Sequence, residues 1–263
     1  MNFADNHTRP RLAVHKFSSC DGCQLALLNA GESLLLLAEK VELVHFVEAG
    51  VVNEMAECDI ALIEGSVSTP QEMERIKHIR AHTQYLVTIG ACATAGGIQA
   101  LRNYADGQQW INSIYAQPEY IASLSTVTPI AAHVRVDFEL WGCPINTKQV
   151  LAMVQSLLLD VTPVDVNDSV CIDCKRQGNN CVLVTQQEPC LGPVTRTGCG
   201  ALCPQFGRAC YGCYGPQENP NVPALRQRFE GLGLAPEIAR QRFQFITSTA
   251  PAFASAAKKS DVT

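Results

Sequence analysis

Apolar runs and segments of helical spacing alternate through the first 160 residues of this 263-residue chain. The apolar runs have the length of strands, and in the segments between them apolar residues recur every three or four positions. The pattern predicts strands at 11–17, 41–47, 60–63, 85–90 and 134–140, and helices at 24–40, 71–81 and 146–159. Near-continuous apolar strands alternating with helices are typical of a parallel sheet covered on both faces. We therefore predict an α/β domain with a doubly wound sheet over residues 1–160.

The pattern changes after residue 160. Regular periodicity gives way to Cys, Gly, Pro and Asn, and a helical stretch returns at 223–242. We predict a second, smaller and irregular domain over residues 161–263, in which bound metal clusters supply part of the folding free energy. The tail from Thr247, which includes Lys258 and Lys259, is expected to be mobile or bound to a partner. For the first domain, the order of the elements favours the flavodoxin-like form of the doubly wound fold.

The composition is that of a globular protein, with 47% hydrophobic and 17% charged residues. The formal net charge of −5 gives no electrostatic reason to expect nucleic acid or an anionic membrane as a partner. The most apolar run, Leu34–Ala38, is far too short to span a bilayer, and Met1–Pro10 has no signal-peptide core. We therefore expect a cytoplasmic protein without a transmembrane segment. In a reducing compartment, thirteen cysteines indicate metal binding rather than disulfides.

Twelve of the thirteen cysteines form three groups of four. The groups are Cys20, Cys23, Cys92 and Cys143; Cys171, Cys174, Cys181 and Cys190; and Cys199, Cys203, Cys210 and Cys213. Four thiolates are what one cubane iron–sulfur cluster needs. Three such groups in one chain indicate a relay for electrons.

The first group follows the ends of predicted strands. Cys20 and Cys23 come after the first strand, Cys92 after the fourth and Cys143 after the fifth, so all four should meet at the carboxyl edge of the sheet. Small residues between Gly90 and Gly97 allow the backbone to approach a bulky cluster. The chain contains neither a G-x-G-x-x-G fingerprint nor a Walker A loop, so nucleotide binding is not expected.

The other two groups lie close together in the second domain. Their spacing is C-x2-C-x6-C-x8-C followed by C-x3-C-P-x5-C-x2-C, and a two-cluster ferredoxin-like module uses all eight cysteines. The alternative is a zinc ribbon built from the C-x-x-C pairs 171/174 and 210/213. That alternative leaves four neighbouring cysteines unexplained.

A few residues with chemical potential fall outside these groups. Cys58 precedes an apolar run and is interpreted as a small buried hydrophobe. His78 and His82 share a helical face without an acidic or cysteine partner, so they are interpreted as solvated. Asp21 is interpreted as a turn residue, with a role in proton relay as the alternative.

Four motifs together carry a family resemblance. They are Ser19-Cys-Asp-Gly-Cys23, Glu64-Gly-Ser66, Gly90-Ala-Cys-Ala-Thr-Ala-Gly-Gly97 and Trp141-Gly-Cys-Pro144. These motifs resemble the small subunit of nickel–iron hydrogenases, and in particular the delta subunit of the cytoplasmic sulfhydrogenase and NADP-reducing group. The resemblance covers nearly the whole chain.

The resemblance implies roles for the three cysteine groups. Cys20, Cys23, Cys92 and Cys143 would bind the proximal 4Fe-4S cluster, with Glu64, Gly90 and Gly97 around it. Cys199, Cys203, Cys210 and Cys213 would bind the medial cluster, and Cys171, Cys174, Cys181 and Cys190 the distal one. The periplasmic uptake branch has a histidine where Cys171 stands and a proline where Cys203 stands, so all three clusters are expected to be 4Fe-4S. Oxygen-tolerant relatives have extra cysteines at positions that resemble Gly22 and Gly97, so an ordinary proximal cubane is expected.

The resemblance also implies a function and partners. The chain would be a non-catalytic subunit of a hydrogenase, carrying electrons between a nickel–iron centre in an obligate large subunit and an iron–sulfur and flavin partner that binds FAD and reduces NAD(P). The acceptor could instead be a deazaflavin or heterodisulfide module. A stand-alone ferredoxin-like carrier is the other alternative. The complex I subunit of the same type has adjacent cysteines in its first motif and no counterpart of the eight later cysteines, so it matches less well.

Overall fold

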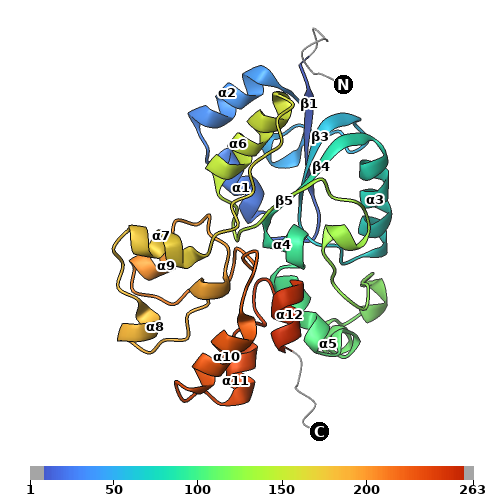
Figure 1. Ribbon diagram of the computed structural model, residues 1–263. Coiled ribbons are helices and arrows are strands. Elements are labelled where there is room, and N and C mark those ends of the chain that lie inside the picture. Colours follow the sequence, from blue (N-terminus) through green and yellow to red (C-terminus); the bar gives the residue numbers. More distant parts are fainter. Residues whose placement is uncertain (1–8, 258–263) are drawn as a thin grey trace. The chain divides into compact units, whose positions relative to one another are not determined.

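The computed structural model describes residues 9–257 and divides the chain into two compact units, residues 1–164 and 165–263 (Figure 1). The division lies four residues beyond the boundary expected at 160/161. Met1–Thr8 and the residues from Lys258 onward lie outside the described part.

The first unit is built on a five-stranded sheet in which every pairing is parallel. Its strands are β1 (Arg11–Lys16), β2 (Glu42–Phe46), β3 (Cys58–Glu64), β4 (Thr83–Ile89) and β5 (Phe138–Leu140). Their order in the sheet is β2-β1-β3-β4-β5, which is the flavodoxin-like order. The predicted α/β fold class is therefore confirmed. In this order the chain reverses direction across the sheet between β1 and β3, where ligands of such folds bind.

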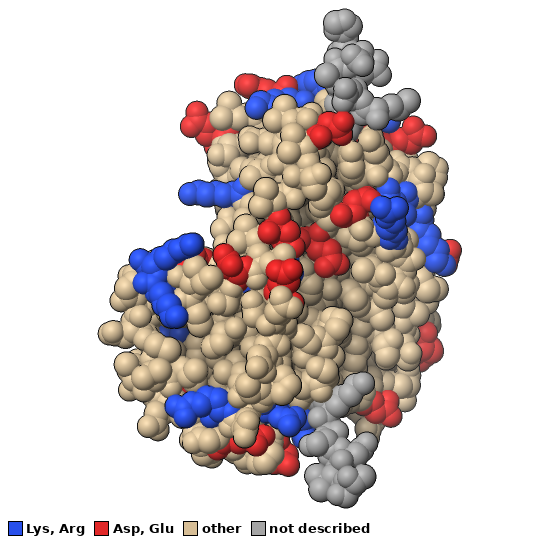
Figure 2. Space-filling view, viewed as in Figure 1, with Lys and Arg blue, Asp and Glu red and all other residues tan. Residues whose placement is uncertain are grey.

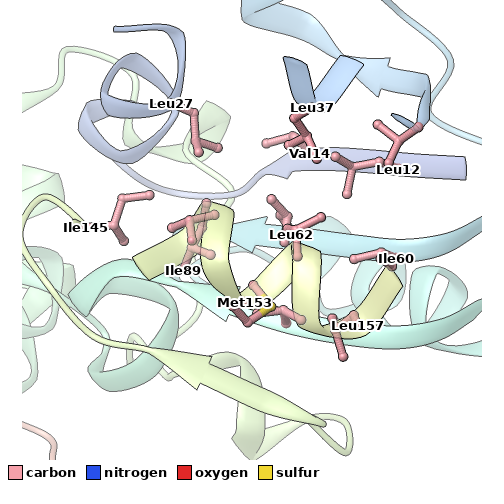
Figure 3. Close-up of a cluster of buried hydrophobic side chains, with 14 of the residues drawn as sticks. Leu12, Val14, Leu27, Leu37, Ile60, Leu62, Ile89, Ile145, Met153 and Leu157 are labelled. Carbon is pink, nitrogen blue, oxygen red and sulfur yellow. The ribbon is translucent and has the colours of Figure 1, made fainter. Parts of the chain in front are cut away.

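Helices cover both faces of this sheet (Figure 1). α1 (Gly22–Leu28), α2 (Glu32–Lys40) and α6 (Thr147–Leu158) cover one face, and α3 (Pro70–Ala81) covers the other. α4 (Gly90–Ala95) follows β4, and after it come a 3-10 segment η3 (Ile98–Tyr104) and helix α5 (Gly107–Ile114), which buries no residue of its own. Side chains alternate along β1, so that Leu12 and Val14 pack under α1, α2 and α6 while Ala13 and Phe17 pack under α3. Figure 3 shows the first of these layers, where Leu27, Leu37 and Met153 meet the strands.

The predicted helix 24–40 is wrong as one element, because it is two helices. α1 ends at Leu28 and α2 starts at Glu32. Gly31 between them has φ 57°, a left-handed backbone conformation that does not occur within a right-handed α-helix. Glycine allows the chain to change direction here, and both helices still pack on the same layer of the core.

The fifth strand is shorter than the predicted 134–140. The Asp137 carboxylate accepts a hydrogen bond from the backbone N–H of Leu86 at 2.8 Å and pairs with Arg80 at 2.5 Å. The Leu86 N–H is thus taken by a side chain, although the backbone N–H of Asp137 still donates to the carbonyl of Leu86 at 2.9 Å. Residue-by-residue pairing with β4 starts at Phe138.

The second unit has six helices and no strand among its described residues. The helices are α7 (Val170–Arg176), α8 (Val182–Thr185), α9 (Leu202–Gln205), α10 (Val222–Glu230), α11 (Pro236–Gln241) and α12 (Pro251–Ala257). The predicted helix 223–242 is wrong as one element, because Gly233 has φ 92° and Pro236 starts a new helix. The segments that carry the cysteines are turns and short helices, as the irregular sequence predicted.

The expectation that the chain is mobile or partner-bound from Thr247 onward is wrong for residues 247–257. The Thr247 hydroxyl donates to the carbonyl of Gly212 at 2.8 Å, and Thr247, Ser248 and Phe253 are buried. The ring of Phe253 lies 6.0 Å from that of Phe243, which in turn lies 5.9 Å from Phe229. This aromatic row forms an apolar core for the unit, which the prediction of a cluster-stabilised domain did not include. Lys258 and Lys259 lie outside the described residues.

Figure 2 shows acidic and basic side chains interspersed over the face in view, with wide neutral areas between them. Among residues 9–257, no helix has the length and apolar character needed to cross a membrane.

Candidate metal centres

Cysteines of the first group lie at the carboxyl edge of the sheet. Cys20 and Cys23 follow β1, Cys92 lies in α4 directly after β4, and Cys143 follows β5. A Cβ placed on Gly22 would lie 3.3 Å from the sulfur of Cys20 and 3.9 Å from Pro144, so the first and last motifs touch. Cys20 and Cys143 are exposed, Cys92 is half-buried and Cys23 is buried. The group therefore reaches the surface through Cys20 and Cys143.

The four thiols are close enough to affect one another's ionisation. Burial, opposed by the hydrogen bond to Gln99 and reinforced by the neighbouring Cys143 and Cys20, raises the pKa of Cys92 to about 11. Burial also raises the pKa of Cys23, with smaller contributions from Glu64, Cys92 and Cys143. Without a cation the buried thiols stay protonated, so binding of iron must release these protons.

Two glycines leave space beside the buried sulfurs. A Cβ on Gly90 would lie 2.4 Å from the Cys23 sulfur, and one on Gly97 would lie 2.4 Å from the Cys92 sulfur. Both glycines also have positive φ, 88° and 67°. Any side chain at either position would collide with a cysteine sulfur. Glycine leaves this space free, as a sulfur that binds a bulky cluster requires of its neighbours.

Glu64 holds the first turn of α1 from the end of β3. One carboxylate oxygen accepts the backbone N–H of Cys23 at 2.9 Å, and the other accepts the side-chain amide of Gln24 at 2.9 Å. Glu64 is 2% exposed, and burial raises its pKa, although the bonds from Cys23 and Gln24 oppose this effect. Glu64 thus contacts the first cysteine group through the backbone N–H of Cys23.

Gln99 is a neighbour of this group that the sequence analysis missed. The Cys92 thiol donates to its side-chain oxygen at 3.5 Å, and its amide nitrogen donates to the carbonyl of Ser18. Gln99 therefore joins the segment after β4 to the segment after β1. Its position two residues beyond Gly97 was the only sequence signal.

The second group surrounds one cavity. Cys171 and Cys174 lie one turn apart on α7, Cys181 precedes α8, and Cys190 precedes the 3-10 turn at Gly192–Val194. All four line the same cavity, together with apolar side chains and Gly192. Burial and the neighbouring Cys190, Cys174 and Cys181 raise the pKa of Cys171 to about 11. The structure therefore brings together every member of the predicted distal set.

The third group is seen as two pairs. Cys199 lies near Cys203, and Cys210 lies near Cys213. The backbone N–H of Cys210 also donates to the sulfur of Cys190 at 3.2 Å, so the second and third groups share a peptide group. Gly212 in turn donates its N–H to the sulfur of Cys210 at 3.5 Å. Hydrogen bonds to ligand sulfurs of this kind set the potentials of iron–sulfur clusters.

The donor sets fit 4Fe-4S clusters in chemistry. Each set is four cysteines without another ligand type, as a cubane requires. In the described residues, no three or more His, Cys, Asp or Glu side chains lie close enough together to bind a single metal ion. The fit therefore rests on what surrounds the sulfurs: glycines without side chains, a cavity bounded by four cysteines, and backbone N–H donors.

The remaining candidate residues have ordinary structural partners. Cys58 is buried and its sulfur lies 3.3 Å from the Thr83 hydroxyl. The rings of His78 and His82 lie 4.2 Å apart near the surface. Asp21 has φ 63° at the start of α1 and pairs with Lys16 at 2.5 Å, as a turn residue does.

A buried histidine pair escaped the sequence analysis. His15 on β1 and His45 on β2 are fully buried, and their rings stack with centroids 4.7 Å apart. Burial, then the neighbouring His45 and Arg75, lowers the pKa of His15 to about 3. Both residues sit inside apolar strand runs, and that placement was the signal that could have predicted the pair.

Comparisons with known proteins agree with this fold and with the position of the first cysteine group. The family described as NADH ubiquinone oxidoreductase, 20 Kd subunit, matches residues 20–157, which hold that whole group. The chain belongs to this family of oxidoreductase subunits. Within this family, the chain resembles the small subunits of nickel–iron hydrogenases, as its individual relatives show.

Two curated relatives and one solved structure define this kind. Sulfhydrogenase 2 subunit delta of Pyrococcus furiosus is 33% identical over 88% of this chain and 97% of its own length. A component of the F420-non-reducing hydrogenase vhu of Methanococcus voltae is 30% identical over 78% of this chain and 82% of its own length. A chain in the crystal structure of an NAD+-reducing NiFe-hydrogenase in the H2-reduced state has a TM-score of 0.54 and 29% identity, covering 60% of this chain and 95% of that chain. The expectation that the chain is a subunit of a hydrogenase oxidoreductase is confirmed.

Proposed function

We propose that this chain is the electron-transfer small subunit of a nickel–iron hydrogenase of the cytoplasm, holding three 4Fe-4S clusters between a nickel–iron large subunit and an NAD(P)-reducing partner with FAD and iron–sulfur centres. The observation that carries the proposal is the convergence of Cys20, Cys23, Cys92 and Cys143 at the carboxyl edge of the sheet, with Gly90 and Gly97 clearing space beside two of the sulfurs. When bound, such clusters take up and pass on single electrons.

The chain's own residues bind and orient these groups. Glu64 fixes the turn that presents Cys23, and Gln99 fixes Cys92. In the second unit, backbone N–H groups point at the sulfurs of Cys190 and Cys210. Hydrogen chemistry is assigned to the partner, and the part proposed for this chain is electron transfer.

An exposed apolar surface supports the presence of a large partner. It comprises the segment after α4 and helix α5, called here the 98–121 surface, with Ile98, Tyr104, Trp110, Ile114, Tyr115 and Tyr120 all between 47% and 76% exposed. α5 buries no residue of its own. Because α4 carries Cys92 and contacts η3, this surface begins beside the first cysteine group. Exposed apolar side chains gathered in one segment beside a candidate redox site indicate a place for a protein partner, and we assign this surface to the large subunit.

The acceptor is proposed from the relatives. The solved structure is described as NAD+-reducing, and the relative from Methanococcus voltae as part of an F420-non-reducing hydrogenase. We propose NAD(P) with a flavin partner, and a heterodisulfide or deazaflavin module is the second candidate. A stand-alone multi-cluster carrier is the alternative from another class, but the exposed 98–121 surface favours a bound partner.

Metal and sulfide analysis of the natively purified protein, with everything that copurifies, tests the proposal. Three cubanes require about twelve iron and twelve sulfide per chain, together with nickel in a larger subunit. Zinc without sulfide contradicts the clusters, and iron without nickel or a large subunit points to a stand-alone carrier.

A matched pair of variants locates the iron. Cys190→Ser removes one ligand of the second group and is expected to lower the iron content by about four atoms or convert one cluster to a three-iron form. Cys58→Ser is the control because Cys58 lies in no group and a serine keeps the contact with Thr83. Equal iron in both variants contradicts the assignment of the second group.

A further inference from the structure

The second unit contains a cavity that the proposed cluster sites do not use. It has a volume of about 220 Å³ and lies between the chain around Cys210 and the end of α11. Its lining is Pro189, Leu191, Ala209, Cys210, Tyr211, Gln241, Arg242 and Phe245. We call it the 211/245 cavity. It lies wholly within one unit, and it touches a residue of the third cysteine group.

Aromatic side chains form the open side of this cavity. The rings of Tyr211 and Phe245 lie 6.4 Å apart, and the two side chains are 37% and 40% exposed. Aromatic rings left partly exposed in this way cost hydrophobic free energy that a bound apolar group would recover. The wall behind them is apolar, because Pro189, Leu191 and Cys210 are buried.

Positive charge borders the same cavity. Arg242 is part of the lining, and the guanidinium of Arg208 lies 5.8 Å from the centre of the Tyr211 ring and donates to its hydroxyl at 3.0 Å. In the described residues, neither arginine takes part in an ion pair, and no described residue of the lining is acidic. An occupant that carries a carboxylate would complement both.

The size of the cavity selects the kind of occupant. Pockets for cofactors and drug-sized ligands range from about 300 to 1,000 Å³, so this one is too small for a flavin or a nicotinamide dinucleotide. It is large enough for one apolar or aromatic side chain. Tyrosine and arginine are the residue types that most often dominate protein–protein binding, and here they surround the opening.

We infer that the 211/245 cavity receives an apolar side chain of the protein that exchanges electrons with the second unit, and that Arg208 and Arg242 bind a carboxylate beside that side chain. The inference rests on the proposed function, because it is the electron-exchanging partner that must approach the second unit. The large subunit is assigned to the 98–121 surface of the other unit. A partner anchored at Tyr211 would lie beside Pro189 and Leu191, which flank Cys190 of the predicted distal group, and beside Cys210, whose N–H donates to the sulfur of Cys190.

The test compares two electron acceptors in the complex purified with its partner subunits. Hydrogen-dependent reduction of benzyl viologen needs the large subunit but no electron-accepting protein. Hydrogen-dependent reduction of NAD+ or NADP+ needs the electron-accepting partner as well. The ratio of the second rate to the first is measured for the unaltered complex, for Arg242→Glu and for Phe245→Ala. Arg228→Glu is the matched control, since Arg228 is an exposed arginine of the same unit that does not line the cavity.

Both cavity variants are expected to lower this ratio by about tenfold or more, because each removes one element of the anchor. They should also lose the partner during gel filtration, while iron content stays equal to that of the unaltered complex. An unchanged ratio and an unchanged subunit composition in both variants overturn the inference, as does an equal loss in Arg228→Glu. Absence of any hydrogen-dependent dye reduction in the unaltered complex contradicts the proposed function instead, so the two failures are distinguishable.

Discussion

Glu64 at the end of β3 accepts a hydrogen bond from the backbone N–H of Cys23 at 2.9 Å, so a buried carboxylate holds a residue of the first cysteine group in place. The same side chain accepts the amide of Gln24, which is itself fully buried. The first cysteine group is therefore held from β3, the strand next to β1 in the sheet, although β3 contributes no cysteine to that group.

Replacing Glu64 tests this arrangement. In Glu64→Gln a donor faces the donors of Cys23 and Gln24, so at least one buried N–H loses its partner, at a cost of about 1–3 kcal/mol of unfolding free energy. We expect a lower thermal midpoint and a changed electron paramagnetic resonance signal from one cluster. Glu74→Gln is the control, because Glu74 is exposed and makes only a surface ion pair with Lys77. The same spectrum and midpoint in both variants would contradict a positioning role for Glu64.

The glycines beside the sulfurs give a second prediction. Gly90→Ala places a methyl group where only 2.4 Å separates it from the Cys23 sulfur, so we expect the loss of one cluster, or about four of twelve iron atoms. Gly50→Ala is the matched control: Gly50 also has positive φ, 79°, but nothing lies within 4 Å of its added Cβ. Backbone strain alone would lower stability in both variants, and iron loss in both variants alike would show that the contact with the sulfur is irrelevant.

The 98–121 surface gives a third prediction. Trp110 is 59% exposed, and Trp110→Glu places a charge in the centre of the surface assigned to the large subunit. Loss of a buried aromatic anchor costs about 2 kcal/mol or more, which is about thirtyfold in affinity. We expect the large subunit to dissociate on dilution, as followed by mass photometry. Leu35→Glu, at a 68% exposed apolar position of α2, should leave the complex intact.

The buried histidine pair makes stability depend on pH. The pKa of His15 in the folded chain is about 3, and its ordinary value is 6.5. Between these two pH values the unfolded chain binds a proton at His15 and the folded chain does not. This contribution to stability is fully present above pH 6.5 and is lost as the pH falls toward 3. Between pH 7.5 and 5.5 the loss is about 1.4 kcal/mol.

His15→Phe removes the proton-binding group and keeps a ring against His45. We expect its thermal midpoint to fall less between pH 7.5 and 5.5 than that of the unaltered protein, measured anaerobically in both. The same decrease in the two proteins would mean that His15 is not the group that titrates.

Much of the fold followed from hydrophobic periodicity, because strands buried on both faces leave apolar runs such as Ile60–Ile63 that few other elements produce. The helix breaks were missed because a glycine in the sequence can continue a helix or end it. Only the structure shows that Gly31 and Gly233 adopt positive φ. The strand limit at Phe138 was missed because it depends on the Asp137 carboxylate and its contact with Leu86.

The cysteines of the candidate sites could be grouped from sequence, since their spacing and their places after strands are local properties. Their neighbours could not. Gln99 and the His15–His45 stack depend on which strands lie side by side, and that order is a property of the folded sheet. The burial of Phe253 depends on an aromatic row drawn from three separate segments.

The peptide group before Cys210 serves two cysteine groups at once, because its N–H binds the sulfur of Cys190 while the side chain it precedes belongs to the third group. A change that moves this peptide alters the surroundings of both groups together. If both groups hold clusters, a substitution that moves the peptide at position 210 changes both reduction potentials together. Evolution of this chain toward a new acceptor would then have to adjust the two potentials elsewhere, at residues that touch only one of the two groups.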